Sequence, residues 1–131
     1  MPALIDTDVA IELMRQNPVT LRHLADYDDA VLVSSITAAE LFFGAYNSAN
    51  PDKNVARTRD FLGRFQRVTV TDAVADRFGR LKAELRRQSV QVAPFDLMIA
   101  SIALEHGCVL VTGNTRHFNR IEGLQIENWI R

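Results

Sequence analysis

Three acidic residues and one asparagine lie beside short apolar runs of this sequence, and their side chains could together hold a divalent cation. These residues are Asp6, Glu40, Asp96 and Asn114. Their carboxylate and amide oxygens favour Mg²⁺ or Mn²⁺ over zinc. Acidic side chains gathered without adjacent lysines or arginines repel one another unless a cation binds between them. The chemistry that such a site would support is metal-activated attack by water.

Each of the four residues also has a purely structural interpretation. Asp6 could cap the first helix, and Asp96 could favour a helix dipole from an N-terminal position. Thr37 and Glu40 have the spacing of a capping box, in which the glutamate bonds the backbone N–H of the threonine. Asn114 suits a turn. A shared site is therefore indicated by the joint placement of the four residues and not by any one of them.

The segments between these residues predict a central sheet. The expected strands are Ala3–Ile5, Val31–Ser34, Val68–Val70, Val109–Thr112 and a weaker Leu124–Glu127. They are apolar without alternation, as is typical of strands covered on both faces. The expected helices are Val9–Met14, Val19–Ala25, Thr37–Tyr46, Asp52–Phe65, Asp72–Arg87 and Pro94–His106, the last stopped by Gly107. Alternating strands and helices predict a three-layer α/β/α domain with a mainly parallel sheet of four to five strands, in an order that the sequence leaves open.

In an open parallel sheet, ligands bind beyond the carboxyl ends of the strands. Asp6 comes at the end of the first strand, Glu40 lies one turn into the helix after the second, and Thr112–Asn114 closes the fourth. Asp96 lies near the start of a helix that runs back toward the fourth strand, so topology leaves its end of the sheet open. We expect three or four oxygen-bearing side chains to converge at one edge.

The composition is that of one small globular domain over residues 1–131. A net charge of −1, from 15 basic and 16 acidic residues, argues against holding nucleic acid by bulk electrostatics alone. The single Cys108 excludes an internal disulfide and a multi-cysteine zinc site and fits a reducing cytosol. No apolar run reaches the roughly 18 residues of a membrane span, and the first residues lack the pattern of a signal peptide. We expect a cytoplasmic protein with no membrane partner.

Four ordered motifs of the sequence resemble those of PIN domains. They are Leu4–Asp8, Ser35–Leu41, Pro94–Ala100 and Leu110–Phe118, and Gly123–Trp129 is similar to the usual end of such chains. The motifs have family-like spacing and together cover essentially the whole chain. Their residues and the chain length resemble the VapC-type toxins of bacterial type II toxin–antitoxin pairs.

This resemblance implies an endoribonuclease that hydrolyses RNA phosphodiester bonds with Mg²⁺ or Mn²⁺ and leaves 5′-phosphate and 3′-hydroxyl ends. The implied metal ligands are Asp6, Glu40 and Asp96, with Asn114 as an auxiliary ligand, and the Thr112 hydroxyl would orient one of these groups. The resemblance also implies a cognate antitoxin that inhibits the enzyme, often with an arginine in the acidic site. A larger toxin–antitoxin assembly would bind DNA through that antitoxin.

Two positions depart from the family pattern. Position 8 is Asp, where the family commonly has Asn or another small polar residue, and this adds negative charge. Position 114 is Asn, where many PIN domains have a fourth acid, so a second metal would be held more weakly. We hypothesise that Asp8 compensates in part for the missing charge of Asn114.

Catalysis by histidine is the weaker option. His117 lies nearest to the expected site, although its segment could equally be a short helical turn. Arg116 and Arg120 are candidate phosphate contacts, as are Arg86 and Arg87, but arginines on helix faces are usually only solvated. Given the net charge of −1, a homodimer would help RNA binding by joining two small basic patches.

The helices before and after Pro51 carry more apolar residues than a small sheet needs as cover. These residues are Leu41, Phe42, Phe43, Tyr46, Val55, Phe61, Leu62 and Phe65. The first interpretation is that most of them form core. The alternative is a groove for a partner helix, which by the family resemblance would belong to the antitoxin.

Three rival functions fit the residues less well. A haloacid-dehalogenase-type phosphotransferase would share the D-x-D form of Asp6–Asp8, but it needs a lysine and a later acidic pair that Thr112–Asn114 does not supply. A phosphorelay receiver domain could use Asp72 after the third strand, but no lysine follows the fifth. A catalytically weak PIN-like binding module would agree with Asn114, whereas the three intact acids argue against it.

Overall fold

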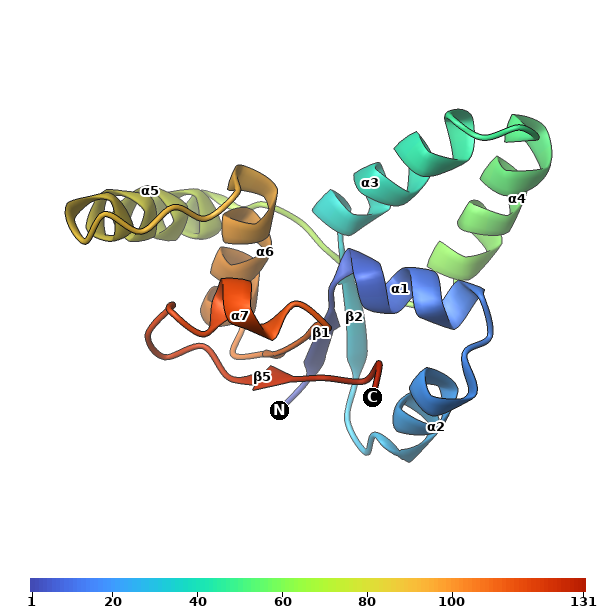
Figure 1. The fold of residues 1–131 in the computed structure, drawn as a ribbon, viewed down its shortest axis with the longest axis horizontal. Coiled ribbons are helices and arrows are strands. Elements are labelled where there is room, and N and C mark those ends of the chain that lie inside the picture. Colours follow the sequence, from blue (N-terminus) through green and yellow to red (C-terminus); the bar gives the residue numbers. More distant parts are fainter.

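The computed structural model describes residues 1–131 (Figure 1). Five parallel strands form one sheet in the order β3-β2-β1-β4-β5. The strands are β1 (Ala3–Ile5), β2 (Val31–Ser34), β3 (Gln66–Val68), β4 (Val109–Val111) and β5 (Ile126–Glu127). In the central strand β1, Leu4 pairs with Leu32 of β2 on one side and with Leu110 of β4 on the other. The direction of winding therefore reverses at β1 and β4, which is where open parallel sheets bind ligands.

Helices cover both faces of this sheet. They are α1 (Thr7–Met14), α2 (Pro18–Asp26), α3 (Ser35–Tyr46), α4 (Pro51–Leu62), α5 (Asp72–Arg87), α6 (Pro94–Glu105) and α7 (Thr115–Phe118). Successive strand residues point to opposite faces, so Leu4 belongs to a core with residues of α5 and α6, whereas Ile5 belongs to a core with residues of α1, α3 and α4. The expected three-layer architecture is confirmed. None of the helices combines the length and the hydropathy needed to cross a bilayer.

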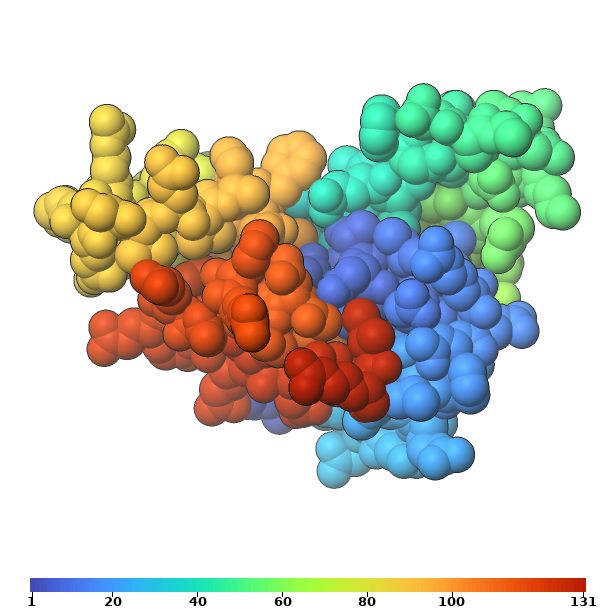
Figure 2. Space-filling view, viewed as in Figure 1, coloured from blue at the N-terminus to red at the C-terminus, as the bar shows by residue number.

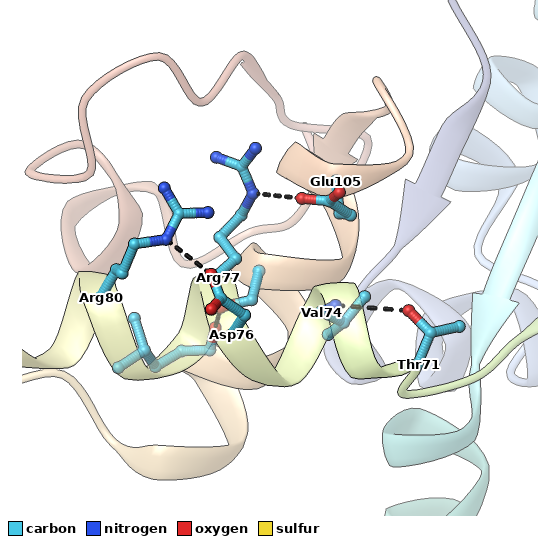
Figure 3. A network of polar contacts seen from close by, with 8 residues as sticks. Thr71, Val74, Asp76, Arg77, Arg80 and Glu105 are labelled. Carbon is cyan, nitrogen blue, oxygen red and sulfur yellow. Dashed lines mark hydrogen bonds and ion pairs between the residues drawn. The ribbon is translucent and has the colours of Figure 1, made fainter.

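Helix α6, which carries Asp96, packs against α5 (Figure 3). The Thr71 hydroxyl caps α5 by accepting a hydrogen bond from the Val74 backbone N–H at 3.3 Å. The Arg77 guanidinium donates to the Glu105 carboxylate, in the last turn of α6, at 2.7 Å. Six of the twelve residues of α6 are buried, all of them between Leu97 and Ala103. These contacts fix the axis of α6 and with it the position of Asp96 in the first turn.

Some boundaries differ from those predicted. The third strand is Gln66–Val68 and not Val68–Val70, because Gln66 is the residue that pairs with Leu32 of β2. Val70 is 40% exposed and belongs to the connection that leads to α5. Helix α4 ends at Leu62, three residues before the predicted end. Gly107 stops α6 as predicted, with a φ of 64° that L side chains rarely adopt.

The apolar residues around Pro51 divide into core and surface. The buried members are Leu41, Val55, Phe61 and Leu62. Phe42 and Phe65 are partly buried and pack against the core beside α1. Phe43 and Tyr46 are exposed by 70% and 59%. The core interpretation is therefore correct for most of the set, and Phe43 and Tyr46 are its two exposed members. Cys108 is buried.

Candidate active site

Asp6 lies at the carboxyl end of β1, where it is only 6% exposed. Its backbone N–H donates to the Val111 carbonyl of β4 at 2.8 Å. One carboxylate oxygen accepts the Thr7 backbone N–H at 2.8 Å, and the other accepts the Thr112 hydroxyl at 2.9 Å. Asp6 is also the N-cap of α1. The capping interpretation is thus correct, and it does not exclude a second role for the same carboxylate.

The pKa of Asp6 is raised from its ordinary value of 3.8 to about 6, and burial is the largest cause. The negative charges of Asp8 and Asp96 contribute to this increase. The hydrogen bonds from Thr7 and Thr112 lower it in part. Asp6 has no lysine, arginine or histidine ion-pair partner. The site therefore gathers negative charge that the protein does not neutralise by itself.

Glu40 does not form the predicted capping box, because α3 begins earlier than the sequence suggested. Ser34 is the N-cap, and its hydroxyl accepts the Thr37 backbone N–H at 3.1 Å. This contact leaves the Glu40 carboxylate free of the helix end, and its Oε1 accepts the Thr7 hydroxyl at 2.6 Å. Thr7 lies next to Asp6 in the sequence, so the two acids are connected through one residue.

Asp96 lies at the same edge of the sheet, a point that the topology alone had left open. Its charge raises the pKa of both Asp6 and Asp8, which requires proximity. Its Oδ2 is 3.4 Å from Nδ1 of His117 in α7, the helix that follows β4. Figure 2 shows the surface hollowed between α6 and α3, above the start of α1. Asp6, Glu40 and Asp96 come from the three elements that border this hollow.

Thr112 and Asn114 occupy the end of β4. The Thr112 hydroxyl is fully buried; besides donating to Asp6, it accepts the Asn114 backbone N–H at 3.0 Å. Asn114 is the N-cap position of α7, yet its side chain makes no capping hydrogen bond. The turn interpretation of Asn114 therefore accounts for its backbone and leaves its side-chain amide for another use.

Asp8 ties the start of α1 to the end of β4. Its two oxygens accept backbone N–H groups, from Val9 at 2.8 Å and from Gly113 at 2.9 Å. Burial raises the pKa of Asp8, and the charge of Asp96 adds to this effect. A Cβ at Gly113 would lie 2.9 Å from the Asp8 carboxylate and 2.5 Å from the end of the Ile130 side chain. The hydrogen bond between Gly113 and Asp8 was not predicted from the sequence, because 105 positions separate the two residues.

The basic residues named as phosphate contacts do not gather at the acids. Arg120 lines a separate pocket of about 280 Å³ together with Arg77 and Arg80 of α5. Arg116 is exposed on α7, and Arg86 and Arg87 are exposed in the last turn of α5. Of the basic side chains, only His117 contacts one of the candidate acids, Asp96.

The donor set suits a divalent cation, although no group of three or more acidic, histidine or cysteine side chains is already arranged as a metal centre. The available ligands at this edge are carboxylate and amide oxygens, which Mg²⁺ and Mn²⁺ prefer. A buried acid with a raised pKa and no basic partner gains stability when a cation binds beside it. The carboxylates of Asp6, Glu40 and Asp96 are therefore suitable ligands for a divalent cation.

A groove of about 230 Å³ adjoins Glu40 and lies between α1, α3 and α4. Its apolar lining includes Ile11, Met14 and Leu41, and its basic lining is Arg15 and Arg57. Arg57 also donates to the Met14 carbonyl at 3.3 Å. An apolar surface with two cations thus lies directly beside one of the candidate ligands.

The sheet order, the acidic edge and the neighbouring groove can be compared with known proteins. A family model described as "PIN domain" matches residues 3–124. The chain belongs to the PIN-domain family. This PIN domain is 36% identical over 127 residues to the tRNA(fMet)-specific endonuclease VapC of Shigella flexneri, and the match covers 96% of each chain. It is also 36% identical over 128 residues to ribonuclease VapC2 of Haemophilus influenzae, with 97% of each chain covered.

Solved structures agree with the family assignment. The PIN domain is similar to a chain of the DNA-bound VapBC structure from Salmonella typhimurium, with a TM-score of 0.93, 33% identity and 98% of each chain covered. It is similar to a chain of VapBC2 from Rickettsia felis, bound to a promoter DNA fragment, with a TM-score of 0.92, 27% identity and 98% and 99% of the two chains covered. The family resemblance drawn from the motifs and the fold class predicted from the alternating strands and helices are both confirmed.

Proposed function

We propose that this PIN domain is a metal-dependent endoribonuclease that acts as the toxin of a type II toxin–antitoxin pair. The observation that carries the chemistry is the buried Asp6 at the carboxyl end of β1, which has no basic partner, with Glu40 linked to it through Thr7 and Asp96 near enough for its charge to raise the pKa of Asp6. RNA as substrate is supported by the relatives named VapC, which are described as a ribonuclease and a tRNA-specific endonuclease.

In this proposal, four residues of the site bind metal and Thr112 positions one of them. Asp6, Glu40 and Asp96 would hold one or two Mg²⁺ or Mn²⁺ ions, with Asn114 as an auxiliary ligand. When bound, such ions activate water and neutralise charge on the phosphate. Thr112 holds the Asp6 carboxylate in place through its hydroxyl. Attack by water would leave 5′-phosphate and 3′-hydroxyl ends.

The contacts of Asp8 favour a structural task over ligation. Both of its oxygens accept backbone N–H groups, so a cation there would compete with two existing hydrogen bonds. Our hypothesis that Asp8 partly replaces a fourth acid is tested by Asp8→Asn. Metal affinity equal to that of the unmodified protein would refute the hypothesis and leave Asp8 as a tie between α1 and β4.

The proposed partner is a cognate antitoxin, as in the VapBC complexes among the solved structures. The groove beside Glu40 offers an apolar floor, and Arg15 and Arg57 would favour an acidic segment. Assembly on DNA would then occur through the antitoxin. A homodimer would join the small basic patches around Arg116 and Arg120, and the reaction would take place in the cytoplasm.

Sequencing of RNA ends after a short induction tests the activity. Cells that express the unmodified protein should accumulate new 5′-phosphate ends at a limited set of positions, and cells that express Asp96→Asn should not. Co-expression of the antitoxin should suppress the ends. The same cleavage positions in both strains, or 2′,3′-cyclic phosphate products, would refute the proposed metal mechanism. The rival phosphotransferase and receiver functions are not favoured by the family match.

A further inference from the structure

Two threonines connect the protein interior to Glu40. The Thr7 hydroxyl oxygen lies 2.6 Å from Oε1 of Glu40 and 3.1 Å from the hydroxyl oxygen of Thr37. Thr37 is fully buried and Thr7 is half-buried. Oε2 of Glu40 makes no hydrogen bond within the protein, so the contact with Thr7 holds one carboxylate oxygen and leaves the other for a ligand.

The protons of these hydroxyls can be assigned by counting. A hydroxyl carries one proton, and an ionised carboxylate only accepts. The short contact between Thr7 and Glu40 therefore takes the Thr7 proton. Thr7 can then only accept from Thr37, whose hydroxyl is shielded from water. The result is a directed chain in which Thr37 donates to Thr7 and Thr7 donates to Glu40.

Such a chain strengthens the contact at its acidic end. Hydrogen bonds to an ionised acceptor are shorter and stronger than neutral ones, and consecutive donors polarise one another in the same direction. The backbone N–H of Thr7 meanwhile donates to Asp6 at 2.8 Å. Thr7 therefore holds two acids at once, one through its N–H and one through its hydroxyl.

We propose that Thr7, supported by Thr37, is a positioning residue that fixes the Glu40 carboxylate relative to Asp6 and so sets the affinity of the site for its divalent ion. This inference rests on the proposed role of Glu40 as a metal ligand. Groups that orient metal ligands contribute roughly 10- to 100-fold to metal affinity. The two threonines act through Glu40 and have no contact with substrate in this role.

Calorimetric titration of Mn²⁺ into the purified full chain tests this inference without any activity assay. Thr7→Val keeps the shape of the side chain and the backbone N–H, and it should weaken Mn²⁺ binding by about 10-fold. Thr7→Ser restores the donor and should return the affinity to within about twofold of the unmodified protein. Thr37→Val should weaken binding by roughly threefold, the size expected for one supporting hydrogen bond.

Thr20 supplies the matched control. It is fully buried in α2, and its hydroxyl has no hydrogen-bond partner. Thr20→Val removes the same atom from the interior and should leave Mn²⁺ affinity unchanged. Three outcomes would each overturn the positioning role of Thr7. They are unchanged Mn²⁺ affinity in Thr7→Val, no rescue by Thr7→Ser, and an equal loss of affinity in Thr20→Val. Glu40→Gln distinguishes the positioning role of Thr7 from the proposed role of Glu40 as a metal ligand. Unchanged Mn²⁺ affinity in this variant would refute the metal-ligand role of Glu40 itself.

Discussion

The Thr112 hydroxyl donates a 2.9 Å hydrogen bond to the Asp6 carboxylate across 106 positions of the chain. The contact is possible because β1 and β4 are neighbours, so that the residues following Ile5 and Val111 leave the sheet side by side. The same hydroxyl accepts the Asn114 backbone N–H, so Thr112 uses its donor for the acid and an acceptor for the following turn. Asp6 and the end of β4 are therefore held as one unit.

Replacing Thr112 by Val should lower the rate of RNA cleavage by roughly 10- to 100-fold. The change removes a buried hydrogen bond to a charged group, which contributes about 1.5–3 kcal/mol, and leaves the Asn114 N–H without its acceptor. Thr112→Ser keeps both contacts and should retain most of the activity. Cleavage of a fluorescent RNA by the purified variants measures the difference. Equal rates for the Val and Ser variants would show that the contact with Asp6 is dispensable.

Asp6→Asn should make the metal-free protein more stable at neutral pH while abolishing activity. Because the pKa of Asp6 in the folded protein lies above its ordinary value, its contribution to stability is fully present below about pH 4 and is lost as pH rises through about 6. The asparagine cannot ionise and avoids this loss. The stability gained by the variant should grow to on the order of 2–3 kcal/mol by pH 7.

Urea unfolding in EDTA at several pH values between 4 and 8 measures this effect as a difference between two proteins. Groups remote from Asp6 titrate alike in both proteins and cancel, so the difference reports Asp6 and the two acids coupled to it, Asp8 and Asp96. A difference in unfolding free energy that stays constant with pH would contradict the raised pKa of Asp6.

Binding of Mn²⁺ should be pH-dependent for the same reason. A metal competes with the proton for Asp6, so affinity should increase about tenfold between pH 5 and pH 7 and level off above. Titrations in buffers of different ionisation enthalpy should also show proton release near pH 6. Removal of the ion with EDTA should stop RNA cleavage, and Mn²⁺ or Mg²⁺ should restore it. Affinity that does not change over this pH range would exclude Asp6 as a ligand.

Gly113→Ala should destabilise the protein by about 1–3 kcal/mol, the usual cost of overpacking. The added methyl group would meet the Ile130 side chain at 2.5 Å and the Asp8 carboxylate at 2.9 Å. Ile130 can move away, but Asp8 is bound to the N–H of Gly113 itself.

Gly79 is the matched control for this substitution. It is an exposed residue inside α5, where a Cβ would meet nothing within 4 Å. Gly79→Ala should increase stability by up to about 1 kcal/mol, since alanine favours helix. Thermal unfolding of the two variants gives the comparison. Similar stability changes in both would mean that Gly113 has no special packing role.

Local sequence determined most of the elements and the identity of the acids. The runs Ala3–Ile5 and Val31–Ser34 are the strands that their composition predicts, and α5 has the predicted limits Asp72–Arg87. Gly107 ends α6 for a reason contained in one residue. Such features depend on side-chain propensity and on neighbours within about four positions, and both are visible in the sequence.

Tertiary structure decided the partner of each acid. Glu40 fits a capping box by spacing, yet it bonds Thr7, 33 positions away, because Ser34 already caps α3. The tie between Asp8 and Gly113 and the position of Asp96 likewise depend on the order β3-β2-β1-β4-β5. Strand order and long-range hydrogen bonds follow from how whole helices pack on the two faces of the sheet. The candidate acids could therefore be identified from the sequence, whereas the packing of the helices and strands decided which contacts hold them.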